Sequence, residues 1–327
     1  MRGKNNMKKI FIVIILLCMT IKSYASFQGS ASLDNLIIKT LPSTDMYFCT
    51  AADKEHFHLL LHLIGSLHGS NFDDTKQIAV FDLGLTPEQR TFLARVKKVS
   101  VYKLEITHPD LLKHFQTRPW NIDNGKMVRG LYAWKPVVIK QALEMFPYIL
   151  YLDAGTAVLK SLRDVFYYIQ EKGYFLLQQP SEKKAFVVGN HCTNYIKNKF
   201  QLNTHAYKWI LKKPDLLAGI QGLSRAMYND YVLPLYALSK DLKNFEDDGS
   251  CSGGFGWARH DQTLFGIHAY LLGLQPIFIN KQVEFQVGNR KCLFKAGRSM
   301  DAHIFYHFRI DEKRYGKKLD VQIRFKS

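Results

Sequence analysis

Residues 148–156 read YILYLDAGT, an apolar and aromatic run that leads directly into a carboxylate at Asp153. A continuous apolar run of this length is typical of a strand buried on both faces of a largely parallel sheet. Open α/β sheets bind ligands at the carboxyl ends of their strands. The sequence therefore predicts a strand over Tyr148–Leu152 and a ligand-facing Asp153, with Ala154 and Gly155 leaving room for a bound molecule. A single Asp after an apolar strand is also common without a function. The neighbouring motifs therefore decide whether Asp153 is read as a binding residue.

Strand-like and helix-like segments alternate on both sides of this stretch, which is typical of an α/β domain with a largely parallel sheet. Further strands are predicted over Met46–Thr50, Gln77–Phe81, Val99–Leu104, Tyr174–Gln178 and Pro276–Asn280. Helices are predicted over Lys54–Leu67, after Thr86 as the cap before Pro87, and over Ala133–Phe146, Leu162–Glu171, most of Leu211–Leu242, and Asp261–Leu272. The sequence contains no internal repeat and no convincing linker, so we expect one continuous domain over residues 45–310.

The first 25 residues have the three parts of a secretory signal peptide. This segment has five basic residues and no acidic one, an apolar run over Ile10–Ile21, and small residues before a cleavage point after Ala25. The apolar run is short for a membrane-spanning helix, which needs about 20 residues, although an uncleaved signal anchor is the alternative. We therefore expect a signal peptide or anchor at 1–25, a short connecting segment at 26–44, and a basic C-terminal tail at 311–327.

The cysteine count leaves the disulfide pairing open. Cys18 lies in the signal segment, so Cys49, Cys192, Cys251 and Cys292 remain downstream. Four cysteines allow three pairings in an oxidising compartment, and the sequence does not choose among them. Buried free thiols are the alternative. The absence of a CxxC pair argues against a zinc site.

The charge of the chain favours an anionic partner. The sequence has 45 Lys and Arg against 28 Asp and Glu, a formal charge of +17, and removal of residues 1–25 leaves 40 basic residues and +12. No P-loop or GxGxxG signature is present, and Leu59 lies between His58 and His62 where a zinc protease needs Glu. Because the positive charge is spread along a chain that has an export signal, nucleic acid is not an expected partner.

Five short motifs then indicate a family. In chain order they are Cys49-Thr50-Ala51-Ala52, Phe81-Asp82-Leu83-Gly84, Tyr132-Ala133-Trp134-Lys135-Pro136, Tyr151-Leu152-Asp153-Ala154-Gly155 and His260-Asp261-Gln262. Together they resemble the nucleotide-diphospho-sugar transferases of the GT-A fold, over roughly residues 45–310. The resemblance implies a single α/β domain with a Rossmann-type mixed sheet flanked by helices. It also implies transfer of a sugar from a nucleotide-diphosphate donor to a hydroxyl acceptor.

The same resemblance suggests the donor-binding residues. It implies that Thr50, Ala51 and Asp82, at the ends of the first two strands, border the nucleotide. The leaving diphosphate develops negative charge, which a cation can stabilise in place of a metal ion. Arg129 and Lys135 precede the apolar strand and are the candidates for this role, with solvated surface side chains as the alternative.

Whether this site binds a divalent metal ion is left open by the sequence. Asp153 occupies the first position of the family's Asp-x-Asp motif, and Gly155 stands where the second carboxylate usually lies. Two carboxylates hold Mn²⁺ or Mg²⁺ against a diphosphate, so a single carboxylate leaves metal dependence open. Related enzymes use a further histidine late in the chain, for which His303 or His307 is the candidate.

The acceptor side of the site is predicted from the last motif and the Gly-rich loop at residues 247–255. Asp261 is either a helix N-cap or the general base that takes the proton of the acceptor hydroxyl. Gly253, Gly254 and Gln262 are candidates for contact with the acceptor. Trp257 is a candidate for stacking on an acceptor sugar, and a core position is the alternative.

These expectations combine into an exported glycosyltransferase whose partners are a nucleotide-sugar donor and a glycan, glycoprotein or glycolipid acceptor. The expected location is the Golgi lumen in a eukaryote, and the periplasm or the medium in a bacterium. Membrane contact is expected only if the N-terminal segment stays as an uncleaved anchor. The alternative is a secreted glycan- or polyanion-binding protein that keeps the fold without turnover, which the single carboxylate at Asp153 motivates.

Overall fold

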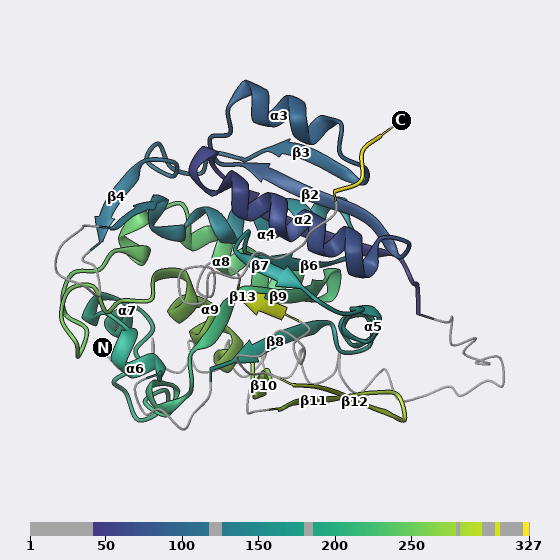
Figure 1. Ribbon diagram of the computed structural model, residues 1–327. Helices are drawn as coiled ribbons and strands as arrows, with labels where there is room; N and C mark the ends of the chain where they lie inside the picture. Colours follow the sequence, from purple (N-terminus) through teal and green to yellow (C-terminus); the bar gives the residue numbers. More distant parts are fainter. Residues whose placement is uncertain are drawn as a thin grey trace, which may run out of the picture. The chain divides into compact units, whose positions relative to one another are not determined.

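The computed structural model describes residues 42–117, 126–179, 186–278, 282–295, 305–307 and 323–326 (Figure 1). These residues belong to one compact unit that begins at Pro42. The predicted signal segment, His303 and nearly all of the basic tail lie outside the described residues. In the part of the chain that the structure describes, no helix is long and apolar enough to cross a membrane.

Among the described residues, the central sheet has seven strands in the order β10-β8-β9-β6-β1-β2-β3, which runs from the bottom to the top of Figure 1. Their bounds are β1 Met46–Ala52, β2 Thr75–Asp82, β3 Val99–Lys103, β6 Tyr148–Leu152, β8 Tyr174–Gln178, β9 Leu216–Ser224 and β10 Ile277–Phe278. Strand β9 is antiparallel to β6 and β8, and the other neighbouring strands are parallel. The mixed sheet confirms the predicted fold class. The strand order reverses between β1 and β6.

Helices cover both faces of this sheet, as predicted. One face carries α2 Phe57–Asn71, α3 Pro87–Ala94 and α5 Arg163–Lys172, and the other carries α4 Trp134–Met145, α8 Leu233–Leu238 and α9 His260–Leu271. Two short helices, α6 Val188–His191 and α7 Asn194–Lys199, follow β8. The predicted start of α3 is confirmed, because the Thr86 side chain accepts from the backbone N–H of Gln89 and the Gln89 side chain accepts from that of Thr86.

Side chains on the central strands alternate between two cores, one on each face of the sheet. On β1, Phe48 belongs to the core beneath α2 and α5, whereas Cys49 belongs to the core beneath α4 and α9. On β6, Leu150 lies in the first of these cores and Tyr151 in the second. Because Asp153 follows Tyr151 by two positions, its side chain continues on the face that α4 and α9 cover.

The prediction of helix over most of Leu211–Leu242 is wrong where β9 occupies Leu216–Ser224. Leucines fill both faces of this strand, and a short apolar run has no period that separates strand from helix. The strand also passes close to α5, since a Cβ at Gly222 would lie 2.4 Å from Cδ1 of Ile169. Glycine at this position therefore serves close packing. The α-helix in this range is limited to α8.

In the part of the chain that the structure describes, three two-stranded antiparallel pairs lie outside the central sheet. They are β4 His114–Thr117 with β5 Lys126–Arg129, β7 Thr156–Val158 with β13 Phe305–His307, and β11 Gln282–Val287 with β12 Arg290–Lys295. The pairing of β13 with β7 brings a late segment beside the residues that follow Asp153, with His307 opposite Thr156. The predicted strand Pro276–Asn280 is confirmed at residues 277–278, and residues 279–280 lie outside the described part.

His268 on α9 should make the stability of the fold depend on pH. Burial lowers the pKa of His268 to about 4 from 6.5, and its buried Nε2 has no hydrogen-bond partner among the described residues. The unfolded state therefore binds more protons than the folded state between these two pH values. The contribution of His268 to the free energy of unfolding is fully present above about pH 6.5. It falls by up to about 3 kcal/mol as the pH drops to about 4.

Urea unfolding across this pH window measures the effect, and His268→Phe should show a shallower loss of stability than the wild type. His205→Phe is the matched control, because His205 is exposed and its replacement should keep the wild-type pH dependence. Equal pH slopes for the wild type and His268→Phe would show that His268 does not carry this effect.

Candidate functional site

A cavity of about 600 Å³ opens at the carboxyl ends of β1 and β6, where the strand order reverses. Open α/β sheets bind ligands at this point, and the volume is typical of small-molecule sites, which span about 300–1,000 Å³. The described residues that line it are Ala51, Ala52, Asp53, Glu55, His56, His58, Leu59, Leu83, His114, Met127, Val128, Arg129, Tyr132, Trp134, Asp153, Ala154 and Gly155. Four predicted donor-site residues, Ala51, Arg129, Asp153 and Gly155, are therefore brought together here.

Asp153 belongs to a cluster of charged side chains at the base of this cavity. The Tyr151 hydroxyl donates to Oδ1 of Asp153 at 2.6 Å, and Nζ of Lys135 lies 3.2 Å from the same oxygen. The Lys135 ammonium also lies 2.7 Å from Oδ2 of Asp261. The side chain of Asp153 is 38% exposed, whereas those of Lys135 and Asp261 are 3% and 8% exposed. Asp153 is therefore the member of this cluster that the cavity reaches.

Three elements far apart in the sequence supply this cluster. Lys135 lies in the first turn of α4, Asp153 follows β6, and Asp261 lies in the first turn of α9. Strand β9 leaves the space that the Asp153 carboxylate occupies, because a Cβ at Gly219 would lie 2.7 Å from its Oδ2. The Gly219 carbonyl also accepts from the backbone N–H of Asp153 at 2.9 Å. Glycine at this one position of β9 thus allows the carboxylate to sit against the sheet.

The electrostatics of the cluster keep Lys135 charged. Burial works against the ammonium, but the nearby carboxylates of Asp153 and Asp261 outweigh it and raise the pKa of Lys135. Burial raises the pKa of Asp261, and the attraction to Lys135 opposes this rise. Burial and the Asp153 charge raise the pKa of Tyr151 well above its ordinary value, so its hydroxyl remains a donor. Two carboxylates thus share one buried cation.

Two segments with left-handed backbone flank this cluster, the turn before α4 and the first residue of α9. In the 3₁₀ turn η2 Gly130–Tyr132, the φ angles of Gly130, Leu131 and Tyr132 are 52°, 51° and 65°, and φ of His260 is 36°. Residues other than glycine adopt this region at a cost of about 1 kcal/mol or more, and such conformations concentrate at functional sites. The rings of Tyr132 and His260 lie 5.9 Å apart. The turn η2 and the start of α9 therefore meet beside Lys135 and Asp261.

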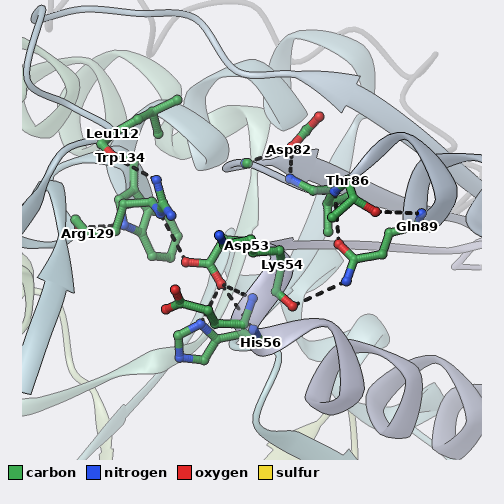
Figure 2. Close-up of polar contacts among 12 residues, drawn as sticks. Asp53, Lys54, His56, Asp82, Thr86, Gln89, Leu112, Arg129 and Trp134 are labelled. Carbon is green, nitrogen blue, oxygen red and sulfur yellow. Dashed lines mark hydrogen bonds and ion pairs between the residues drawn. The ribbon is translucent and has the colours of Figure 1, made fainter.

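A second polar group, around Asp53, forms one wall of the cavity (Figure 2). Oδ1 of Asp53 accepts from the backbone N–H groups of Glu55 and His56 at 3.1 and 3.0 Å and lies 2.7 Å from Nδ1 of His56. Oδ2 accepts from Nε of Arg129 at 3.0 Å, and Nη1 of Arg129 donates to the Leu112 carbonyl at 2.7 Å. Burial acts to raise the pKa of Asp53, but the bonds from His56 and Arg129 outweigh it and hold the pKa well below its usual range.

Two sets of residues can be tested as ligands of a divalent metal ion. Oxygen or nitrogen atoms of Asp53, Glu55 and His114 lie within 4.8 Å of one another. Both oxygens of Asp53 already accept protein hydrogen bonds, one of them from the Arg129 cation, so this set is a poor fit for a second cation. At the Asp-x-Asp position, the described residues supply the single carboxylate of Asp153, with Lys135 3.2 Å from its Oδ1. Neither described set alone fits a Mn²⁺ or Mg²⁺ site, which prefers several oxygen ligands.

His307, the predicted metal ligand, has only its backbone described. It pairs with Thr156 across β13 and β7, one position beyond Gly155. The pairing places the backbone of His307 beside the segment that follows Asp153. The role itself stays a prediction.

Two residues predicted to border the nucleotide lie elsewhere. Thr50 is buried within β1, and its Oγ1 has no hydrogen-bond partner in the described part of the chain. The carboxylate of Asp82 accepts from the backbone N–H groups of Gly84 and Leu85 and from Nε of Arg90. Asp82 faces a second hollow of about 730 Å³ beside β3, which it lines together with Arg90. Its contact with a nucleotide stays a prediction.

The predicted acceptor residues do not line the cavity among the described residues. The ring of Trp257 lies parallel to that of His191, with 6.1 Å between centroids, and a Cβ at Gly253 would lie 2.2 Å from this indole. Trp257 is partly buried and belongs to neither core of the sheet, so its stacking on an acceptor sugar stays a prediction. Gly254 has a φ of 77°, which suits glycine, and Gln262 is partly buried in α9. Their acceptor contacts stay predictions.

Sequence reasoning missed Asp53, His56 and Tyr151. Asp53 follows the apolar end of β1 in the same way that Asp153 follows β6, so the argument made for Asp153 would have found it. Tyr151 lies two positions before Asp153, and residues two apart on a strand share a face. No sequence pattern marks His56 as a site residue. Its contact with Asp53 depends on the one-turn helix η1 Lys54–His56, which Asp53 caps.

No family model matches the sequence, and no curated protein matches it significantly. Solved structures with a similar fold include the galactosyltransferase LgtC in complex with donor and acceptor sugar analogs, at 13% identity and a TM-score of 0.40, over 68% of this chain and 70% of that one. Mouse xyloside xylosyltransferase 1 in its apo form has 13% identity and a TM-score of 0.42, over 72% and 85%. Core-mannan synthase A from Aspergillus fumigatus, in its Mn/GDP form, has 10% identity and a TM-score of 0.38, over 74% and 71%. In fold, the chain is similar to these glycosyltransferases.

Proposed function

We propose that the protein is a glycosyltransferase that moves a sugar from a nucleotide-diphosphate donor to a hydroxyl acceptor. The observation that carries the proposal is the position of the cavity at the strand-order reversal, with Asp153 at its base held by Lys135 and Tyr151. A carboxylate fixed in this way is suited to accept hydrogen bonds from sugar hydroxyls. The motif order that resembles the GT-A transferases supports the same chemistry.

Arg129 is the cation on the cavity wall best suited to the diphosphate. Its bonds to Asp53 and to the Leu112 carbonyl use two of the five N–H donors of a guanidinium. These bonds fix the orientation of the side chain before a ligand arrives. A fixed cation that faces the leaving group stabilises the negative charge that develops during transfer.

Lys135 and Asp261 act beneath the cavity in this proposal. Lys135 fixes the Asp153 carboxylate, and Asp261 in turn holds the Lys135 ammonium. Asp261 is buried and pairs with the Lys135 ammonium, so its role in this proposal is to position Lys135. Its role as general base is an expectation from the late Asp-Gln motif, and it requires a movement that brings the acceptor to Asp261.

We further infer that the enzyme acts outside the cytosol. The signal-like segment at residues 1–25 supports export, and the charge of +12 on the remaining chain would attract an anionic donor or a polyanionic glycan. The second candidate is a glycan- or polyanion-binding protein without turnover. Gly155 favours it, because the described cavity wall has glycine at the second position of the Asp-x-Asp motif.

A donor screen on the full chain tests both candidates. UDP-sugars and GDP-sugars are supplied with and without Mn²⁺, while donor hydrolysis and the thermal midpoint are followed. We expect one nucleotide class to raise the midpoint and to be hydrolysed slowly, because water replaces a missing acceptor. Stabilisation by glycans without hydrolysis of any donor would favour the binding protein. No stabilisation by any donor and no hydrolysis would exclude the transferase.

A further inference from the structure

The segment that ends α6 and the Gly-rich loop lie side by side. Oγ of Ser252 donates to the Asn190 carbonyl at 3.2 Å, and the backbone N–H of Asn194 donates to Oγ of Ser250 at 2.7 Å. These two bonds pair residue 252 with 190 and residue 250 with 194, so the two segments run in opposite directions. Cys192 is the middle residue of the first segment, and Cys251 is the middle residue of the second.

Two further observations place the Cys192 and Cys251 thiols in one environment. Both side chains are buried, and the thiols lie close enough for an ionised Cys251 to raise the pKa of Cys192. The Lys197 ammonium and the Asp248 carboxylate each act on both thiols. Both thiols are free in this structure, and the facing segments and shared charged neighbours bring them into one region of the fold.

The other two cysteines of the described chain lie in different surroundings. Cys49 lies inside the central sheet on β1, between Ala79 on β2 and Tyr151 on β6. Cys292 lies on the β11–β12 hairpin, opposite Phe285, in the core of the other sheet face. Of the three pairings that four cysteines allow, the one that includes Cys192 with Cys251 is thus the one that the facing segments support.

We propose that Cys192 and Cys251 form an intramolecular disulfide when the protein folds in an oxidising compartment. Each thiol loses one proton, and together they pass two electrons to an oxidised dithiol or to glutathione disulfide, which is reduced to two thiols as the Sγ–Sγ bond forms. The bond joins α6 to the Gly-rich loop, ten residues before Asp261. It would hold the segment after α6 against this loop.

The burial of these thiols determines when the bond forms. Burial raises the pKa of Cys192 and of Cys251 to about 12, and Lys197 opposes this rise only in part. Thiol–disulfide exchange proceeds through the thiolate, so oxidation is slow once the loop has closed. The disulfide therefore forms during folding, before these side chains are buried.

Peptide mapping tests this pairing on the full chain carrying Cys18→Ser. The protein is unfolded, refolded in reduced and oxidised glutathione, and alkylated under denaturing conditions so that burial protects no thiol. Trypsin cleavage without reduction should then give residues 185–197 linked to residues 244–259, at two hydrogens below the summed mass. Each of these peptides contains one cysteine. Alkylated Cys192 and Cys251 after refolding, or a link from either one to Cys49 or Cys292, would overturn the proposal.

Two variants provide the controls. Cys192→Ser should abolish the linked peptide and leave Cys251 fully alkylated, whereas Cys49→Ser should keep the link. The thermal midpoint of the oxidised wild type should exceed that of the reduced form by about 5 °C, and Cys192→Ser should show no such difference. Because every readout reports thiols or stability, the result is independent of whether the protein transfers a sugar.

Discussion

Replacing Lys135 with Met should lower the free energy of unfolding by about 3–5 kcal/mol at neutral pH. In the wild type, the Lys135 ammonium lies 2.7 Å from Asp261 and 3.2 Å from Asp153, and it is buried. Removal of this cation leaves Asp261 as a buried carboxylate without its partner. Burial already raises the pKa of Asp261, so in the variant the folded state should take up a proton there. Urea unfolding of wild type and variant measures the loss.

The pH dependence of Lys135→Met identifies the cause of this loss. A carboxylate whose pKa is raised on folding binds more protons in the folded state than in the unfolded state, so stability falls as the pH rises. The variant should therefore be less destabilised at about pH 5 than at about pH 8. Adding Asp261→Asn to Lys135→Met should recover most of the lost stability. A loss that is independent of pH, or one that the double variant does not reduce, would mean that packing and not charge explains it.

Lys172→Met is the matched control for this experiment. The Lys172 side chain is 48% exposed and pairs with Glu171 at the surface. Exposed ion pairs contribute about 0–1 kcal/mol, so this variant should remain close to the wild type. A large loss for Lys172→Met would indicate that any lysine removal disturbs this fold.

Strand β6 shows which features of the site the local sequence predicts. The apolar run Tyr148–Leu152 specifies a buried strand by composition alone, and the next residue marks the binding edge of the sheet by position. Both predictions are local, and the structure confirms the strand with the same bounds. The same holds for the cap of α3, because Thr86 and Gln89 act within one turn.

The rest of the site depends on contacts that no local pattern encodes. Lys135 and Asp261 are far apart in the sequence. They form an ion pair because α4 and α9 cover the same face of the sheet. A short apolar run that does not distinguish strand from helix concealed β9, whose Gly219 leaves room for the Asp153 carboxylate. The burial of Lys135 was likewise hidden, because a lysine in a Trp-Lys-Pro sequence is compatible with either a solvated or a buried position. Tertiary packing therefore decides between alternatives that the sequence left open.

Asp153→Asn should lower donor turnover by about 100-fold or more while leaving the fold intact. The amide is close in shape to the carboxylate, and its oxygen can still accept from the Tyr151 hydroxyl. In this variant Lys135 still pairs with Asp261. The thermal midpoint should therefore stay within a few degrees of the wild type. What the variant loses is the negative charge that faces the cavity. The measurement is the rate of donor hydrolysis, with kcat and KM determined separately.

Tyr151→Phe extends this test, because it removes the hydroxyl that donates to Oδ1 of Asp153 at 2.6 Å and leaves the charge in place. If Asp153 must be held in one orientation, this variant should lose about 10-fold in kcat, less than Asp153→Asn. Asp74→Asn is the matched control, since Asp74 pairs with Arg163 at the surface and does not line the cavity among the described residues. It should keep the wild-type rate. A wild-type rate in Asp153→Asn would remove Asp153 from the site, whereas equal losses in all three variants would indicate a general effect on folding.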